Sequence, residues 1–427
     1  MSSNNLKQQL RDIPIPSGLR ERSKLGIERA IMEQKEGYRS KSKRIRRTVG
    51  VIVAGLALLF LSADLMNHNY VWAAIQKTLQ FVPGIGIVKE DNSPSERYIL
   101  KQPISLSVGE GSIMITGILS DEEMTYITMT GTESPRFIEK VTLVNAQGIE
   151  YTLSSANSSW SLTEWTSGFW YKGKLDASGN IKLVIDLKPR IEVPLTLARA
   201  ETYSSYPEMG ETDTVNGVSI TAIPDRVGAK ARISLVARHS EDFNIIDYGI
   251  LGVYNHENRK LNVLDDKGKK LEIEHIQGSP VGEFYFKLSS DNAPNGYTLT
   301  LPEIGVIYKN EVSIKIPTEA KDHIDQTFEI AGFPVTITKT ERVKENGLRV
   351  YLDFHYNDQA VASLYNFDIE GISSVAKLKA TTGVIDYIEF DVEPGSKQVK
   401  LKLVRPGVIV RGPWQFEWSE EDFKVEE

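Results

Sequence analysis

The chain has 427 residues, of which 41% are hydrophobic and 25% charged, a composition typical of globular domains that bury a core. It contains no cysteine, which excludes disulfides, thiolate metal sites and cysteine nucleophiles. The net charge of −7 is divided unevenly, because residues 1–47 carry +8 and the other 380 residues carry −15. A basic segment joined to an acidic body favours two compartments over one nucleic-acid-binding surface, and we expect no direct contact with nucleic acid.

Residues 1–47 form a basic head with one amphipathic helix in the sequence pattern. Proline disfavours helix in the residue before it, so Ile13 and Ile15, each followed by proline, are expected to be extended. Ser17 can then cap a helix whose apolar face holds Leu19, Ser23, Ile27, Ala30 and Ile31. A segment this short cannot bury a core alone, so this face needs a partner, either a protein groove or the membrane surface.

Residues 48–66 are predicted to be the only transmembrane helix. Sixteen residues from Thr48 to Ala63 carry no charge, and nineteen residues in a helix cover about 28 Å, close to the hydrocarbon thickness of a bilayer. The basic residues Lys43, Arg44, Arg46 and Arg47 precede this stretch and Asp64 lies at its far end. The positive-inside rule therefore predicts a single-pass protein of the cell membrane with a cytoplasmic N-terminus and extracellular C-terminal domains. A long signal peptide or a buried core helix is the alternative.

Residues 67–97 are expected to be a juxtamembrane helix followed by a linker. Trp72, Ile75, Leu79 and Val82 recur at helical spacing before Pro83, which predicts a short helix on the outer membrane interface. The run Lys89–Arg97 is polar and is predicted to be a linker.

The rest of the chain shows internal repetition. An Ile-Thr pair in an alternating segment occurs at Ile115, Ile220 and Ile337, at offsets of 105 and 117 residues. An alternating stretch follows each pair, at residues 126–130, 232–236 and 348–352, which is typical of half-buried antiparallel strands.

Further segments match between the copies. Residues 141–148 resemble residues 261–268, and in both a strand leads into a glycine-containing hairpin turn. Residues 168–171 match residues 282–286, and closing strands are expected at 191–197, 312–317 and 414–418. We therefore predict a mainly β fold with tandem immunoglobulin-like β-sandwich domains over residues 98–200, 201–318 and 319–427. A continuous β-solenoid is the alternative, but its period would be much shorter.

We find no constellation of residues typical of an enzyme, and we expect no catalytic residue, cofactor or metal site. The six histidines are scattered without ligand spacing. Asp265-Asp266-Lys267-Gly268 lacks the alternating oxygen ligands of a calcium loop and is predicted to be a hairpin turn. The carboxylates of residues 420–422 and 426–427 are typical of a solvated acidic end.

An aromatic group could form a platform that faces a carbohydrate or a protein partner. It comprises Trp160, Trp165, Phe169, Trp170 and Tyr171. The alternative is that Phe169 and Tyr171 point into an ordinary core while Trp170 fills a joint between domains.

The overall plan resembles a known family. It combines Ile-Pro-Ile-Pro-x-x-Leu at residues 13–19, a following helix, a basic cluster, a single span and Phe81-Val82-Pro83-Gly84-Ile85-Gly86. These features resemble the membrane-anchored anti-sigma-factor proteins of Gram-positive bacilli, whose ectodomains are domains of unknown function. The zinc-binding His and Cys residues of other anti-sigma factors are absent.

The resemblance implies that the head sequesters an extracytoplasmic-function sigma factor, and we expect Ile13, Ile15 and the apolar face of the following helix to bind it. The ectodomain would then sense an envelope signal, such as an extracellular ligand or a cell-wall component. The alternative function is a membrane-anchored surface binding or adhesion protein in which the head is only an anchor.

Overall fold

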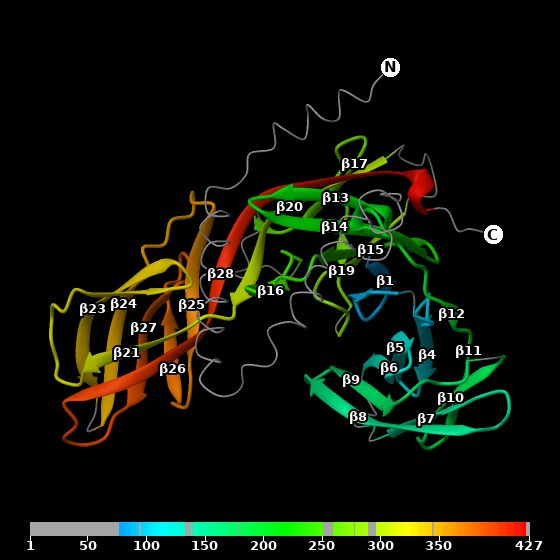
Figure 1. The fold of residues 1–427 in the computed structure, drawn as a ribbon, viewed down its shortest axis with the longest axis horizontal. Coiled ribbons are helices and arrows are strands. Elements are labelled where there is room, and N and C mark those ends of the chain that lie inside the picture. Colours follow the sequence, from blue (N-terminus) through cyan, green and yellow to red (C-terminus); the bar gives the residue numbers. More distant parts are fainter. Residues whose placement is uncertain are drawn as a thin grey trace, which may run out of the picture. The chain divides into compact units, whose positions relative to one another are not determined.

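The computed structural model describes residues 77–93, 95–132, 138, 140–177, 179–250, 259–276, 278–288, 296–343 and 346–423 (Figure 1). Within these ranges the protein is mainly β, as predicted. Nowhere in them is there a helix with the length and apolar character needed to cross a membrane. The helix predicted in the head and the span predicted over residues 48–66 lie outside the described residues.

The first described element is a hairpin of β1 (Thr78–Val82) and β2 (Ile87–Asp91). The helix predicted to include Leu79 and Val82 is therefore wrong here, since both are buried side chains of β1; Trp72 and Ile75 lie outside the described residues. Helical spacing gave the wrong prediction here. The positions are surrounded by β-branched and aromatic residues, which favour strands, and are followed by a Pro-Gly-x-Gly turn, which favours a hairpin. The predicted linker is also wrong in part, because residues 89–91 belong to β2 and Arg97 is buried.

We call residues 98–200 the first repeat, residues 201–318 the second and residues 319–427 the third. The first repeat forms an antiparallel sheet in the order β11-β10-β7-β8-β9-β6-β5-β3-β12, with β4 also paired to β5. Its strands are β3 (Tyr98–Ile99), β4 (Ile104–Val108), β5 (Gly111–Ser120), β6 (Met124–Thr132), β7 (Lys140–Val144), β8 (Glu150–Trp160), β9 (Glu164–Lys172), β10 (Ile181–Ile185), β11 (Ile191–Leu195) and β12 (Ala198–Arg199).

The second repeat contributes a five-stranded sheet in the order β13-β14-β15-β19-β18. Its elements are the 3-10 helix η1 (Tyr206–Glu208) and the strands β13 (Glu211–Val215), β14 (Val218–Val227), β15 (Lys230–Ala237), β16 (Phe243–Asp247), β17 (Asn262–Asp265), β18 (Ile273–Glu274), β19 (Glu283–Lys287), β20 (Gly296–Tyr308) and β21 (Glu311–Pro317).

The third repeat contributes a five-stranded sheet in the order β22-β23-β24-β27-β26. Its elements are β22 (Gln326–Ile330), β23 (Phe333–Val343), β24 (Gly347–Asp353), β25 (Ala362–Ile369), β26 (Ser374–Leu378), β27 (Ile385–Asp391), β28 (Gln398–Ser419) and the 3-10 helix η3 (Glu420–Phe423).

The same strand order recurs in the three repeats. The series β4-β5-β6-β9-β8 corresponds to β13-β14-β15-β19-β18 and to β22-β23-β24-β27-β26. The segments aligned on Ile115, Ile220 and Ile337 are β5, β14 and β23, each the second strand of its series. The repetition seen in the sequence is therefore confirmed at the level of strand pairing.

The turns aligned between the first two repeats also share their chemistry. The side-chain oxygen Oδ1 of Asn145 accepts hydrogen bonds from the backbone of Gln147 and Ile149. In the same way Oδ1 of Asp265 accepts from the backbone of Lys267 and Lys269. Asp265 thus closes a hairpin turn, as predicted, by the side-chain capping typical of Asn and Asp.

The 22-residue strand β28 joins the second and third repeats. Its first part pairs with β21, from Gln398 opposite Pro317 to Val404 opposite Glu311, and its last part pairs with β20, from Gly407 opposite Ile307 to Ser419 opposite Gly296. The segment 414–418, predicted to close the third repeat, therefore pairs with a strand of the second. One hydrophobic cluster accordingly runs from Val218 to Phe423, whereas the core of the first repeat is separate.

Candidate functional site

The turn of the β1–β2 hairpin is packed against the first two repeats. Gly84 has φ +72°, and a Cβ atom there would overlap the carbonyl oxygen of Thr116 on β5. Gly86 has φ +71°, and a Cβ atom there would overlap the ring of Pro280 in the second repeat. Glycine is required at both positions for the backbone angle and for this close approach.

A buried carboxylate holds the turn from the side of the second repeat. Glu283 on β19 is 1% exposed, and its Oε2 accepts hydrogen bonds from the backbone N–H of Gly84 at 3.2 Å and from the hydroxyl of Ser234 at 3.4 Å. The hydroxyl of Tyr285 donates to its Oε1 at 2.8 Å. Burial raises the pKa of Tyr285, and the charge of Glu283 raises it further. A buried carboxylate with donors on both oxygens is a strong, directional anchor.

A buried guanidinium lies in the same sheet. Arg232 on β15 is 2% exposed, pairs with Asp225 and donates to the backbone carbonyl of Lys101 at 2.7 Å. Burial lowers its pKa, but the charges of Asp225 and Glu283 outweigh this effect and raise it. Among the described residues the Nε of Arg232 has no hydrogen-bond partner, and its side chain lines a cavity of about 180 Å³ beside Phe81 and Pro83 of the hairpin.

The base of the hairpin is fixed by a second ionic group. Arg97 donates to Asp91 of β2 at 3.1 Å and to Asp121 of the first repeat at 3.3 Å, and it also contacts the amide oxygen of Gln80. Arg97, Gln80 and Asp121 are all buried. Removing Arg97 would leave the buried carboxylate of Asp121 without its cationic partner, which is strongly destabilising.

The hairpin also pairs with the segment that connects the first two repeats. Leu79 exchanges two backbone hydrogen bonds with Tyr203, at 2.8 and 2.9 Å. The amide of Gln80 donates to the hydroxyl of Thr202 at 3.2 Å. The hairpin therefore contacts both repeats and their connection, so a change in any of the three would alter its environment.

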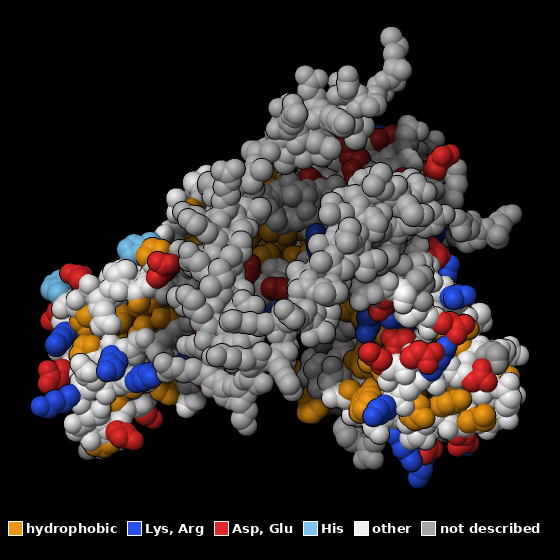
Figure 2. Space-filling model, in the orientation of Figure 1, with side chains coloured by type: hydrophobic (Ala, Val, Ile, Leu, Met, Phe, Trp, Pro, Cys, Tyr) orange, Lys and Arg blue, Asp and Glu red, His pale blue; other side chains and the backbone are white. Residues whose placement is uncertain are grey.

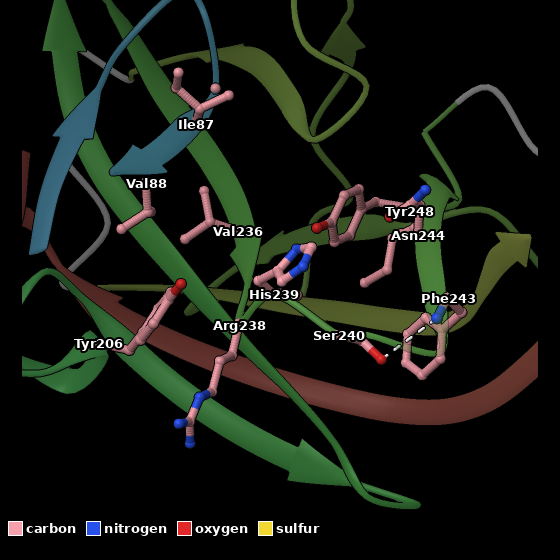
Figure 3. A pocket seen from close by; sticks show the side chains of 13 residues that line it. Ile87, Val88, Tyr206, Val236, Arg238, His239, Ser240, Phe243, Asn244 and Tyr248 are labelled. Atoms are coloured by element: carbon pink, nitrogen blue, oxygen red, sulfur yellow. Dashed lines mark hydrogen bonds between the residues drawn. The ribbon is translucent and has the colours of Figure 1, made fainter. Parts of the chain in front are cut away.

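A cavity of about 270 Å³ lies between β2 and the second repeat (Figure 3). Ile87 and Val88 of the hairpin form one side, and Val236, His239 and Tyr248 face them. Tyr206 points into this space, while Arg238 points away from it. Burial raises the pKa of Tyr206 to about 12, helped by the negative charge of Glu90 on β2.

The site has the character of a joint, because its buried charged groups hold the hairpin against the repeats. Among the described residues, no group of three or more His, Asp or Glu side chains is placed to hold a metal ion. His275 contacts the backbone carbonyl of Glu283 at 2.8 Å, and His355 contacts Thr336 at 2.9 Å, so these two histidines have local structural partners. On the coloured part of the surface in Figure 2, basic and acidic side chains are intermixed.

The sequence-predicted partner residues lie elsewhere. The candidates in the head and the membrane-flanking residues, including Asp64, are outside the described residues. The aromatic group is split by the sheet of the first repeat: Trp165 and Phe169 are buried, Tyr171 is partly buried, and Trp160 and Trp170 are exposed. Core packing is thus correct for Phe169, while the exposed Trp170 does not fill a joint.

Sequence reasoning missed Glu283, Arg232 and Arg97. Glu283 and Arg232 are each a single charge beside apolar residues on a strand, as in Glu283-Phe284-Tyr285-Phe286, whereas Arg97 ends a polar run just before β3. A charged residue on a buried strand must be paired. A single charge in an apolar strand therefore indicates a buried ion pair or hydrogen bond, and this feature of the sequence could have identified Glu283 and Arg232.

Comparison with known proteins adds little. No family model matches the chain, and no curated protein matches it. Among solved structures, the crystal structure of the conserved domain protein from Bacillus anthracis matches with 11% identity over 49% of this chain and 80% of that chain. Its TM-score of 0.17 is too low to support an argument about fold or function.

Proposed function

We propose that the protein is a single-pass membrane regulator, an anti-sigma factor whose β-rich ectodomain senses the cell envelope. The basic head, the uncharged stretch 48–63 and the family resemblance support this assignment. We also assign the repeats to the immunoglobulin-like type of β-sandwich, because short antiparallel strands recur in units of the right length.

The observation that carries the proposal is the packing of the β1–β2 hairpin. Strand β1 begins at Thr78, twelve residues after the end of the predicted span at Met66. Through Gly84 and Glu283 the hairpin is held by the second repeat, and through Arg97 and Asp121 it is held by the first. Any rearrangement of the repeats reaches residues 48–66 along the chain only through β1.

In the proposed mechanism the hairpin has a docked and a released state. A ligand that favours one state shifts the equilibrium by no more than its difference in affinity for the two. The docked state retains the sigma factor on the head, and the released state lowers the affinity of the head for it. Release also opens the peptide bonds of residues 78–91, which are paired in the docked state, to a protease.

The test is co-purification of the full chain, in detergent micelles, with the sigma factor encoded beside its gene. We expect a complex that is lost when Leu19, Ile27 and Ile31 are changed to Ser. A matched variant with Arg20, Glu28 and Lys35 changed to Ala alters the polar face of the same segment and should retain the complex. Absence of a complex with the unmodified chain at micromolar concentration contradicts the proposal.

The second candidate function is a membrane-anchored surface binding protein. The observation that favours it is the exposure of Leu162, in the connection between β8 and β9, and of Trp170 on β9. Replacing residues 1–40 by an unrelated basic sequence separates the two functions. A regulator loses repression of its target genes after this exchange, whereas a surface binding protein keeps its activity.

A further inference from the structure

A second site lies on the first repeat. A hollow of about 230 Å³ opens on the sheet formed by β6, β9 and β8. The side chains around it include Tyr126, Asn157, Ser159 and Thr166, and Gly168 and Gly278 also line it. The described residues of its lining contribute hydroxyl, amide and backbone groups, and none of them carries a carboxylate, ammonium or guanidinium group.

The pairing of the strands places an exposed indole next to this hollow. Trp170 lies opposite Tyr126, and Gly168 lies opposite Thr128. Successive side chains of a strand alternate between the two faces, so Trp170, Gly168 and Tyr126 share the outer face. Phe169 points the other way, into the core. Directly opposite residues have Cβ atoms about 5 Å apart, so Trp170, 44% exposed, is the neighbour of Tyr126 on this face, while the lining itself ends at Tyr126 and Gly168.

Gly168 forms the floor of the hollow. A Cβ atom at this position would overlap both the hydroxyl of Tyr126 and the amide oxygen Oδ1 of Asn157. These two polar atoms therefore converge above the glycine. Within the part of the chain that the structure describes, neither the Tyr126 hydroxyl nor the Asn157 amide makes a hydrogen bond, so both can serve a ligand.

The chemistry of the hollow selects one class of ligand. Aromatic rings pack on the apolar faces of flat or ring-shaped ligands, while hydroxyl and amide groups form hydrogen bonds with hydroxyls. The absence of charged groups in the lining disfavours anions and charged peptides. The volume is below the about 300–1,000 Å³ of pockets for drug-sized ligands, which fits a single ring of a longer chain.

We propose that this hollow binds one pyranose ring of a neutral glycan, with the ring stacked on Trp170 and its hydroxyl or acetamido groups bonded to Tyr126 and Asn157. The assignment is independent of the head and its partner. It gives the ectodomain a ligand class even if the protein does not bind a sigma factor.

The full chain, in a detergent without a sugar headgroup, is titrated with chitotetraose and, separately, with maltotetraose. Isothermal titration calorimetry measures the binding. We expect at least one of the two to bind at micromolar to millimolar concentration. Trp170→Ala and Asn157→Ala should each weaken binding at least tenfold, and Trp170→Phe should restore most of the affinity. The urea midpoint of each of the three variants is compared with that of the wild type, so that a folding defect is recognised.

Trp160→Ala is the matched control. Trp160 is also a tryptophan of this sheet and is more exposed, at 66%, but it lies opposite the buried Trp165, on the other face. Its loss should leave the affinity unchanged. Absence of binding by both oligosaccharides, or an equal loss of affinity in Trp160→Ala and Trp170→Ala, would overturn the proposal.

Discussion

Glu283 is the residue on which the docking of the hairpin depends most. Its carboxylate accepts from Gly84, Ser234 and Tyr285 while almost fully buried. Glu283→Ala leaves these donors without their acceptor and removes a negative charge near Arg232, and an unsatisfied buried group costs about 1–3 kcal/mol. We expect a lower urea midpoint and faster cleavage between residues 78 and 91.

The control for this prediction is Glu274→Ala. Glu274 lies on the neighbouring strand β18, and its pair with Lys230 is exposed to solvent. Exposed pairs contribute about 0–1 kcal/mol, so this variant should keep the wild-type cleavage rate. Equal cleavage of both variants would show that Glu283 does not hold the hairpin.

Tyr206 gives the joint a dependence on alkaline pH. Its pKa is raised to about 12 in the folded protein, chiefly by burial, whereas an unfolded tyrosine ionises near pH 10. The unfolded state therefore loses the proton first, and stability should fall as the pH rises from about 10 to 12. Urea unfolding of Tyr206→Phe, which has no such proton, should show a smaller fall over this window. Identical pH profiles for the two proteins would contradict the assignment.

At the scale of elements, the hairpin turn can be displaced by a substitution that changes no charged residue. Gly84→Ala places a methyl group against the backbone of Thr116 and should release the hairpin. Gly109→Ala introduces the same kind of backbone strain, at φ +61°, but has no atom within 4 Å of the new methyl group. Backbone strain should lower the free energy of unfolding of both variants by about 1–2 kcal/mol. Only Gly84→Ala should speed hydrogen exchange in residues 78–91, and equal rates in both variants would count against a close-packed turn.

The local sequence pattern predicted the strands and turns themselves better than it predicted the segments with which they pair. The strands that contain Ile115, Ile220 and Ile337, and the turn at Asp265, follow from alternation and turn chemistry within a few residues. Leu79 and Val82 fit both a helical and a strand pattern. The strand is stabilised by pairing with β2 and, at Leu79, by backbone bonds to the distant Tyr203. The anchor at Glu283 could not be assigned for the same reason, since Gly84 is 199 residues away.

At the scale of the whole molecule, β28 makes the second and third repeats interdependent. Trp414 is fully buried and donates from its indole nitrogen to the backbone of Val218. Its pattern with Phe416 and Trp418 predicted a strand, but a strand pattern does not specify its neighbour. The sequence therefore did not predict that β28 pairs with β21 along its first part and with β20 along its last part.

Trp414→Ala tests this interdependence, with an expected loss of about 3–5 kcal/mol. Hydrogen exchange should rise both in β15 of the second repeat and in β24 of the third, since one core connects them. Leu183→Ala, in the separate core of the first repeat, should raise exchange in β6 instead. A rise confined to the second repeat in Trp414→Ala would mean that the third repeat is stable alone.

We propose that docking of the β1–β2 hairpin controls the affinity of the head for a sigma factor. The most direct measurement is the amount of the neighbouring gene's sigma factor that co-purifies with the full chain as wild type, Gly84→Ala and Gly109→Ala. We predict that the wild type and Gly109→Ala retain it equally and that Gly84→Ala retains clearly less. Equal retention by all three proteins would contradict the coupling, and no retention by the wild type would contradict the anti-sigma function itself.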